Sequence, residues 1–151
     1  MDLNACGLEH LSRHECKRLM GSVPLGRIVY SRQALPAVEL VNFTMDDQGD
    51  IIIRTDAGGK LAAATRGAVV AFETDSTDFA AHTGWSVTVV GYAQAVIDTD
   101  EIHRLEQSVV DPWAPGDHPH FIKVSPAIIN GRRIGVKRLA GQRCGSSLNC
   151  D

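Results

Sequence analysis

The feature that most constrains the fold is a hairpin pattern in the first half of the chain. Residues 37–45 and 51–55 are both rich in β-branched and apolar side chains, and the first run alternates between two faces. The five residues that separate them, 46–50, contain three aspartates and a glycine, which favour a tight turn. The pattern predicts two antiparallel strands that pair locally, so hairpins build this part of the sheet.

Five other runs have the same composition of β-branched and aromatic residues. They are predicted as strands over residues 26–31, 68–74, 85–97, 121–125 and 128–136. The first of them is expected to be interrupted at Leu35-Pro36, because proline lacks the backbone N–H that a central strand needs. Many strands with few helices between them predict a mainly antiparallel barrel or sandwich and argue against a Rossmann-type parallel sheet.

Three short helices are predicted between the strands, over residues 12–20, 60–65 and 100–110. In the first, Ser12 followed by Glu15 has the spacing of a capping box, and Gly21 ends the helix. In the third, Thr99 or Asp100 is expected to cap the first turn. The predicted order is therefore one helix, three strands, a second helix, two strands, a third helix and two strands.

The composition excludes several classes of protein. The chain has 151 residues, of which 44% are hydrophobic and 22% charged, as in an ordinary single-domain globular protein. Its net charge of −3 argues against a nucleic-acid partner. No apolar run approaches the roughly 20 residues of a membrane helix, and the first twenty residues lack a signal-peptide core, so we expect a cytoplasmic protein. We expect one domain over residues 8–138 and a poorly ordered tail over residues 139–151.

The cysteines and histidines do not predict a metal site. The four cysteines form no Cys-x-x-Cys pair and are expected to be reduced thiols: Cys6, Cys16, Cys144 and Cys150. His10 and His14 have the spacing of two ligands on one helix. Because the predicted cap Ser12 lies between them, His10 falls outside the helix, and surface histidines are the preferred interpretation.

A candidate phosphate site lies where the third strand ends and the second helix begins. Gly58 and Gly59 allow close approach of a ligand to the backbone, and Lys60 adds a cation beside the N–H groups of the helix start. Arg54, at the strand end, offers a second, forked cation. On spacing alone, a simple turn with a solvated lysine stays open as the alternative. Asn42, which interrupts an apolar strand, is either an edge residue or a ligand contact.

Six short motifs then identify a family resemblance that covers about residues 8–136. They occupy residues 23–30, 41–43, 53–55 with 59–61, 72–73, 84–87 with Gly91, and 112–116. In this order they resemble the pyridoxamine 5′-phosphate oxidase-like superfamily, closest to its small nitroimidazole-resistance-like, flavin-binding branch. The resemblance implies an antiparallel FMN-binding split β-barrel that forms a homodimer, with one FMN per subunit in grooves at the dimer interface.

The resemblance also implies a set of cofactor-binding residues. The phosphate positions are Arg54, Thr55 and Lys60, and the isoalloxazine positions are Glu39, Leu40, Val41 and Asn42. The remaining cofactor-binding positions are Gly59, Leu61, Trp85, Ser86 and Trp113. Trp85 and Ser86 match a position that often reaches the cofactor from the other subunit. Trp113, in a proline-rich loop, could stack on the ring. Packing at the interface is the alternative role for both tryptophans.

The expected function is that of an FMN-dependent oxidoreductase acting on an unidentified small molecule. A flavin supplies the redox chemistry itself, which fits a chain without an evident catalytic dyad. The vitamin-forming oxidases of the superfamily carry an Arg-x-His pattern that is absent from residues 130–134, so pyridoxamine phosphate oxidation is not expected.

Three alternatives stay open at this point. Relatives that use a deazaflavin coenzyme or haem suggest a different cofactor on the same fold, with His82 as the first candidate haem ligand. A flavin-binding module without turnover is the second alternative. The third is nucleic-acid binding by the cations near the C-terminus, for which a solvated strand edge is the preferred explanation: Arg132, Arg133, Lys137, Arg138 and Arg143.

Overall fold

The computed structural model describes residues 3–4, 8–55, 60–108 and 120–135 of the chain. Its helices are α1 (Arg13–Met20), α2 (Lys60–Thr65) and α3 (Thr99–Ser108). Its strands are β1 (Leu3–Asn4), β2 (Leu8–Leu11), β3 (Leu25–Arg32), β4 (Leu35–Met45), β5 (Ile51–Thr55), β6 (Val69–Asp78), β7 (Thr83–Ala95) and β8 (His120–Ile134). No helix within these ranges is long and apolar enough to span a membrane.

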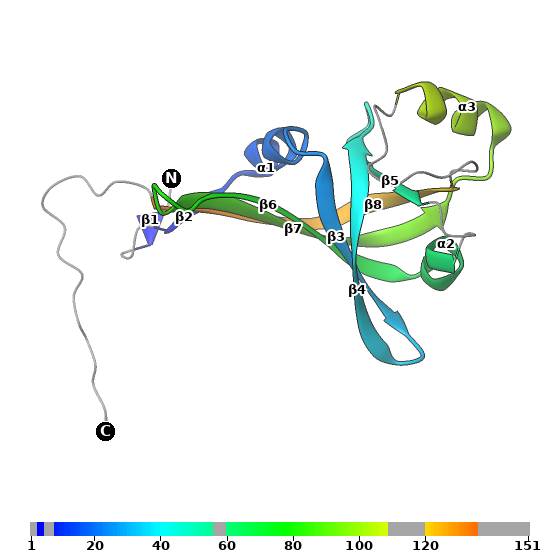
Figure 1. Ribbon diagram of the computed structural model, residues 1–151, viewed down its shortest axis with the longest axis horizontal. Coiled ribbons are helices and arrows are strands. Elements are labelled where there is room, and N and C mark those ends of the chain that lie inside the picture. Colours follow the sequence, from blue (N-terminus) through cyan, green and yellow to red (C-terminus); the bar gives the residue numbers. More distant parts are fainter. Residues whose placement is uncertain (1–2, 5–7, 56–59, 109–119, 136–151) are drawn as a thin grey trace, which may run out of the picture.

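Six antiparallel strands close into a barrel in the order β3-β4-β5-β8-β7-β6, with β6 pairing back to β3 (Figure 1). The predicted fold class, a mainly β split barrel, is therefore confirmed. The hairpin that dominates the sequence is present, since Met45 pairs with Ile51 and Asn42 pairs with Arg54 across β4 and β5. The closure of the ring gives each barrel strand a partner on both sides over part of its length.

The second half of β8 leaves the barrel and forms an arm. Residues 120–124 of β8 pair with β5, whereas residues 131–134 pair with β2, and β7 accompanies β8 throughout. We use the name arm for β1, β2, residues 131–134 of β8 and the ends of β6 and β7 that meet at the turn between them. Figure 1 shows it extending to one side of the barrel, with α1 over the junction of the two. The sequence did not predict β1 or β2.

Two predicted strand breaks at prolines are wrong. Residues 121–125 and 128–136 were expected as two strands, but β8 is continuous through Pro126, with a bulge where Val90 pairs with Ile128 and Gly91 pairs with Pro126. A bulge removes the need for one ladder hydrogen bond, so proline is tolerated there. Gly91 is required beside it, because a Cβ would lie 2.1 Å from the Ser125 carbonyl oxygen.

The other misplaced break is at the turn between β3 and β4. The turn residues are Gln33 and Ala34, which both have positive φ, and Pro36 already pairs with Ser31 inside β4. This end of β4 pairs with β3 alone among the described strands, and a strand edge accommodates proline.

The barrel interior is filled by apolar side chains that the strands contribute alternately. The largest fully buried side chains of the cluster include Ile28, Ile51, Ile53, Phe72, Val87, Val89, Ile122 and Val124. Phe72 meets Phe43 edge to face at 4.8 Å between ring centroids. Gly26 leaves room for the Phe72 ring, because a Cβ would lie 2.2 Å from Phe72 Cζ. This packing fixes the strand register that positions the site.

The helices lie outside the barrel and are capped close to where the sequence predicts. The Ser12 hydroxyl accepts a hydrogen bond from the Glu15 N–H at 3.2 Å, which confirms the cap of α1. The cap of α3 is Asp98, which accepts from the N–H groups of residues 100 and 101, and not Thr99 or Asp100. Cys16 is a buried free thiol; the other three cysteines and the predicted tail, residues 139–151, lie outside the described residues.

Candidate functional site

Arg54 and Thr55, two of the predicted phosphate residues, lie at the end of β5, where it pairs with β4 and β8. Arg54 pairs with Asn42 on β4, so the two side chains lie next to each other on the same face of the sheet. Among the described residues, no side chain forms a hydrogen bond or ion pair with the half-buried guanidinium of Arg54. A cation that its described neighbours do not neutralise is suited to an anionic ligand.

Thr55 adds a polar atom to this end of the barrel from the opposite face of β5. Its side chain is nine-tenths buried, and its Oγ1 has no hydrogen-bond partner among the described residues. A buried hydroxyl without a partner costs about 1–3 kcal/mol, so such an atom indicates that a partner is needed. Leu61, at the start of α2, is buried in the core, and Lys60 is the first residue of that helix as predicted. Gly59 lies outside the described residues.

The four predicted isoalloxazine residues alternate between the two faces of β4. Leu40 and Asn42 share the face of Arg54, and Leu40 is 64% exposed. Val41 is buried on the opposite face, which also carries Glu39. A ring lying along one face of this strand can therefore contact the side chains of either Leu40 and Asn42 or Glu39 and Val41, together with the backbone of the other two residues.

Tyr30 is a residue of this region that the sequence analysis did not select. Its buried hydroxyl donates a hydrogen bond to Glu39 Oε1 at 2.5 Å, and this bond is the main reason that the pKa of Tyr30 is raised. Tyr30 lies in the motif of residues 23–30, but its contact with Glu39 depends on the register of β3 against β4. The interaction fixes the position of the carboxylate of Glu39, an otherwise exposed residue of β4.

Trp85 and Ser86 are not brought together with Arg54 and Thr55 within one chain. They lie in the arm, whereas the phosphate residues lie near the other end of β7, where Ala95 pairs with Ile122. The ten residue-to-residue steps from 85 to 95 span about 30 Å of extended strand. Trp113 lies outside the described residues. A single chain therefore supplies two separate parts of the predicted site.

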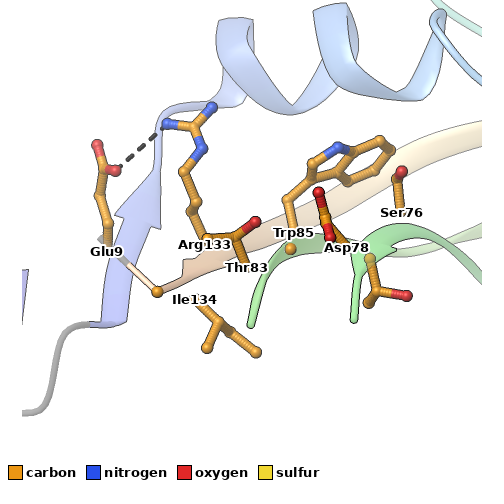
Figure 2. Close-up of a pocket in the computed structure, with 10 residues that line it drawn as sticks. Glu9, Ser76, Asp78, Thr83, Trp85, Arg133 and Ile134 are labelled. Atoms are coloured by element: carbon orange, nitrogen blue, oxygen red, sulfur yellow. Dashed lines mark hydrogen bonds and ion pairs between the residues drawn. The ribbon is translucent and has the colours of Figure 1, made fainter. Parts of the chain in front are cut away.

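The arm contains a cavity of about 590 Å³, shown in Figure 2. Its lining residues come from four strands and the residue after β8: Glu9, Ser76, Thr77, Asp78, Thr83, Gly84, Trp85, Arg133, Ile134 and Gly135. Figure 2 shows Trp85 and Arg133 extending from the same side of the strands, with Ile134 on the opposite side. We call this cavity the arm pocket.

A network of ion pairs joins β2 and β8, two of the strands that line the arm pocket, to α1. Arg133 donates to Glu9 Oε2 at 3.3 Å and to Glu15 Oε1 at 3.0 Å, while Arg18 also donates to Glu15, at 2.6 and 2.9 Å. The hydrogen bonds from Arg18, and to a smaller extent those from Arg133, lower the pKa of Glu15 to about 2.

The expectation of a solvated strand edge at Arg132 and Arg133 is wrong, because β8 is paired there with β2 on one side and β7 on the other.

The outer face of the barrel carries several exposed apolar side chains on neighbouring strands. The most exposed of them are Val38, Leu40, Val69, Tyr92 and Ile128, each with 55% or more of its surface accessible. Strand pairing connects Val38 to Ile128 in a row through Val29, Ala71 and Val90, and Val69 lies opposite Tyr92. A contiguous apolar face of this kind is typical of a surface that another molecule covers.

Metal ligands are not grouped in the part of the chain that the structure describes. No cluster of three or more His, Cys, Asp or Glu residues lies within these ranges. His82, the candidate haem ligand, is exposed in the turn between β6 and β7, where its φ is positive. These positions give no geometric support to a haem site at His82.

Comparison with known proteins reveals clear relatives. The family model for pyridoxamine 5′-phosphate oxidase matches residues 12–133. The Mycobacterium tuberculosis protein Rv0080 is 40% identical over 129 residues, covering 82% of this chain and 84% of that protein. The FAD binding protein from Mycobacterium smegmatis has a TM-score of 0.72 and 34% identity, covering 83% of this chain and 98% of its own. A proposed pyridoxamine 5′-phosphate oxidase from Corynebacterium glutamicum has a TM-score of 0.74 and 30% identity, covering 91% and 99%.

Proposed function

Because the chain belongs to the pyridoxamine 5′-phosphate oxidase family, we propose that it binds a flavin, FMN, and acts as a homodimeric oxidoreductase on a small molecule. The observation that carries the proposal is the pair of unsatisfied polar groups at adjacent positions of β5. Arg54 offers a cation and Thr55 a buried hydroxyl, and neither has a side-chain partner among the described residues. Because these are the last two residues of β5, a phosphate just beyond the strand end would lie within reach of both side chains, although they extend from opposite faces of the strand.

The residues present fit this cofactor. Arg54 and Lys60 would neutralise the phosphate, the Thr55 hydroxyl would donate to one of its oxygens, and Asn42 would lie beside it on β4. Glu39, held by Tyr30, would place a fixed carboxylate near the ring. When bound, a flavin accepts or donates a hydride, so the protein's own residues have to bind it, orient it and tune its potential.

A second copy of the chain would complete the site. The apolar outer face that includes Val38, Leu40 and Tyr92 supports self-association, since burying it would remove that surface from water. Trp85 and Ser86 lie about 30 Å of strand away from the phosphate residues of their own chain. In the proposed homodimer, the arm of one subunit would bring these two residues to the phosphate end of the other barrel.

FAD is the second candidate cofactor, because the Mycobacterium smegmatis relative at 34% identity is named for binding it. The two flavins share the phosphate next to the ribityl chain, so Arg54 and Thr55 would serve both. The absence of an Arg-x-His pattern over residues 130–134 argues against pyridoxamine phosphate as the substrate.

The test of the phosphate site is a double variant, Arg54→Ala with Lys60→Ala. Loss of two charge-assisted contacts should weaken FMN binding about 100-fold or more, measured by the quenching of flavin fluorescence on titration of the purified protein. The matched control is Arg66→Ala, which removes an exposed cation just after α2 and should leave FMN affinity unchanged. Unaltered affinity in the double variant, with the same gel-filtration profile, would show that the phosphate binds elsewhere.

A further inference from the structure

Glu39 is the one charged residue of β4, and it lies on the face of that strand that otherwise carries apolar side chains. Val41, the next residue on this face, is buried, and Ile28, which pairs with Glu39 from β3, is fully buried. Residues 35–41 of β4 pair with β3 alone among the described strands, so Glu39 lies on a strand with one open edge. A carboxylate at such a position either protects the edge from further pairing or belongs to a site.

The Glu39 carboxylate is held by a neutral donor and not by a cation. The buried hydroxyl of Tyr30 donates to Glu39 Oε1 at 2.5 Å. This hydrogen bond, with a smaller contribution from burial, raises the pKa of Tyr30, so the phenol stays protonated and continues to donate. Arg32, on the same face of β3, has a weaker opposing effect on that pKa.

The negative charge of Glu39 is not cancelled by its described neighbours. In the part of the chain that the structure describes, no Lys, Arg or His side chain forms an ion pair with it. Glu39 is also exposed, so a ligand lying on β4 can approach its carboxylate. The pair of Glu39 and Tyr30 therefore presents a negative charge of fixed position to whatever binds along this strand.

Such a charge has a definite effect on a flavin, because reduction changes the charge of the isoalloxazine ring. A hydride brings one hydrogen and two electrons, so a neutral ring gains a negative charge unless a proton is also taken up. A nearby carboxylate repels this added charge and has little effect on the neutral oxidised ring. In the proposed site the ring lies along residues 39–42, next to Glu39.

We propose that Glu39 lowers the reduction potential of the bound flavin, and that Tyr30 is the positioning residue that holds the Glu39 carboxylate beside the ring. The proposal rests on the proposed flavin-binding function and applies equally to FMN and FAD, which share the isoalloxazine. Glu39 thereby weakens binding of the reduced flavin relative to the oxidised flavin and makes the reduced flavin a stronger hydride donor. Protection of the strand edge would need the charge of Glu39 but not its hydrogen bond with Tyr30.

The experiment measures the reduction potential of FMN bound to the full-length protein, by anaerobic equilibration with a reference dye. Glu39→Gln removes the charge and keeps an oxygen that can accept from Tyr30. It should bind reduced FMN about tenfold more tightly relative to oxidised FMN, which for a two-electron couple raises the potential by about 30 mV. Asp47→Asn, which removes an exposed charge from the β4–β5 turn, is the matched control and should leave the potential unchanged.

Two further variants separate the charge of Glu39 from its position. Glu39→Asp keeps the charge, so its potential should stay closer to that of the wild type than to that of Glu39→Gln. Tyr30→Phe leaves the carboxylate free to turn towards solvent, so it should raise the potential by a smaller amount than Glu39→Gln does. In the Glu39→Gln background, Tyr30→Phe should have no further effect, because the charge that it positions is absent.

The outcomes distinguish this proposal from the proposed function. An unchanged potential of bound FMN in Glu39→Gln would overturn the proposal, leave flavin binding intact and make edge protection the role of Glu39. A wild-type potential in Tyr30→Phe would overturn the positioning role of Tyr30. If the wild-type protein binds no FMN or FAD, the proposed function fails and this proposal fails with it.

Discussion

The barrel and the arm share three strands, yet side chains on one face of these strands have different surroundings. In the barrel, Val87 and Val89 of β7 are fully buried. In the arm, Trp85 on the same face is half-buried. Ile134, on the opposite face, exposes 47% of its surface, and Phe79, in the turn between β6 and β7, exposes 85%. The same strands therefore supply buried core side chains at one end and accessible apolar side chains at the other. The buried side chains stabilise the fold, and the accessible ones are available for binding.

The two regions are also held together by different forces. The barrel interior is apolar and closely packed, as the edge-to-face contact of Phe43 with Phe72 illustrates. The arm is joined to α1 by charges, because Arg133 bridges Glu9 on β2 and Glu15 on α1. We therefore expect barrel stability to respond to side-chain volume and arm stability to respond to charge.

The largest expected effect is that of Phe72→Ala in the barrel. Phe72 is fully buried, and its removal leaves a cavity against Phe43 and Gly26, so the free energy of unfolding should fall by about 3–5 kcal/mol. Urea denaturation followed by circular dichroism measures the change.

Phe79→Ala in the arm is the matched comparison for Phe72→Ala. The same atoms are removed from a side chain that is 85% exposed, so the free energy of unfolding should change by less than about 0.5 kcal/mol. Similar losses in the two variants would mean that the arm is packed as the barrel is, and the distinction between the regions would be wrong.

The β4–β5 hairpin of the barrel was predictable from the sequence because its pairing is local. Residues 46–50 specify a turn that fixes the register of β4 on β5, and that register places Asn42 beside Arg54. The errors arose at prolines, where strand pairing overrides the local preference for a strand end. Pro126 and Pro36 suggest strand ends, but a bulge and a free strand edge accommodate them.

The arm pocket was not predictable, because no local pattern connects its parts. Its central row joins Glu9, Ser76, Trp85 and Arg133, which come from four segments of the chain. The sequence selected Trp85 through a family resemblance and interpreted Arg133 as a solvated cation. The row forms because β8 changes partners from β5 to β2, and a strand's change of partner leaves no periodicity in its own residues.

An intermediate effect is expected for Arg133→Met, which removes the central charge of the arm. The Glu9 side chain is 9% exposed and would lose its cation, so the free energy of unfolding should fall by about 1–2 kcal/mol. Hydrogen exchange followed by mass spectrometry should show faster exchange in β2 and in residues 131–134 of β8, with the barrel strands unchanged.

The control for Arg133→Met is Arg18→Met. Arg18 pairs with Glu15 on the exposed side of α1, with 58% of its side chain accessible, so its loss should change stability by less than about 0.5 kcal/mol. Uniform acceleration of exchange across the barrel in the Arg133 variant would show that arm and barrel unfold as one unit, contrary to the comparison above.

The smallest effect is the pH dependence that Glu15 contributes. Its pKa is about 2 in the folded protein and about 4.5 in the unfolded chain, so the folded state favours the ionised carboxylate. The resulting stabilisation is complete above about pH 4.5 and is lost as the pH falls towards 2. Urea denaturation of wild type and Glu15→Gln should therefore differ most at neutral pH and converge near pH 2. A difference that persists unchanged at pH 2 would mean that the contribution of Glu15 is packing and not charge, and that the arm is not held to α1 electrostatically.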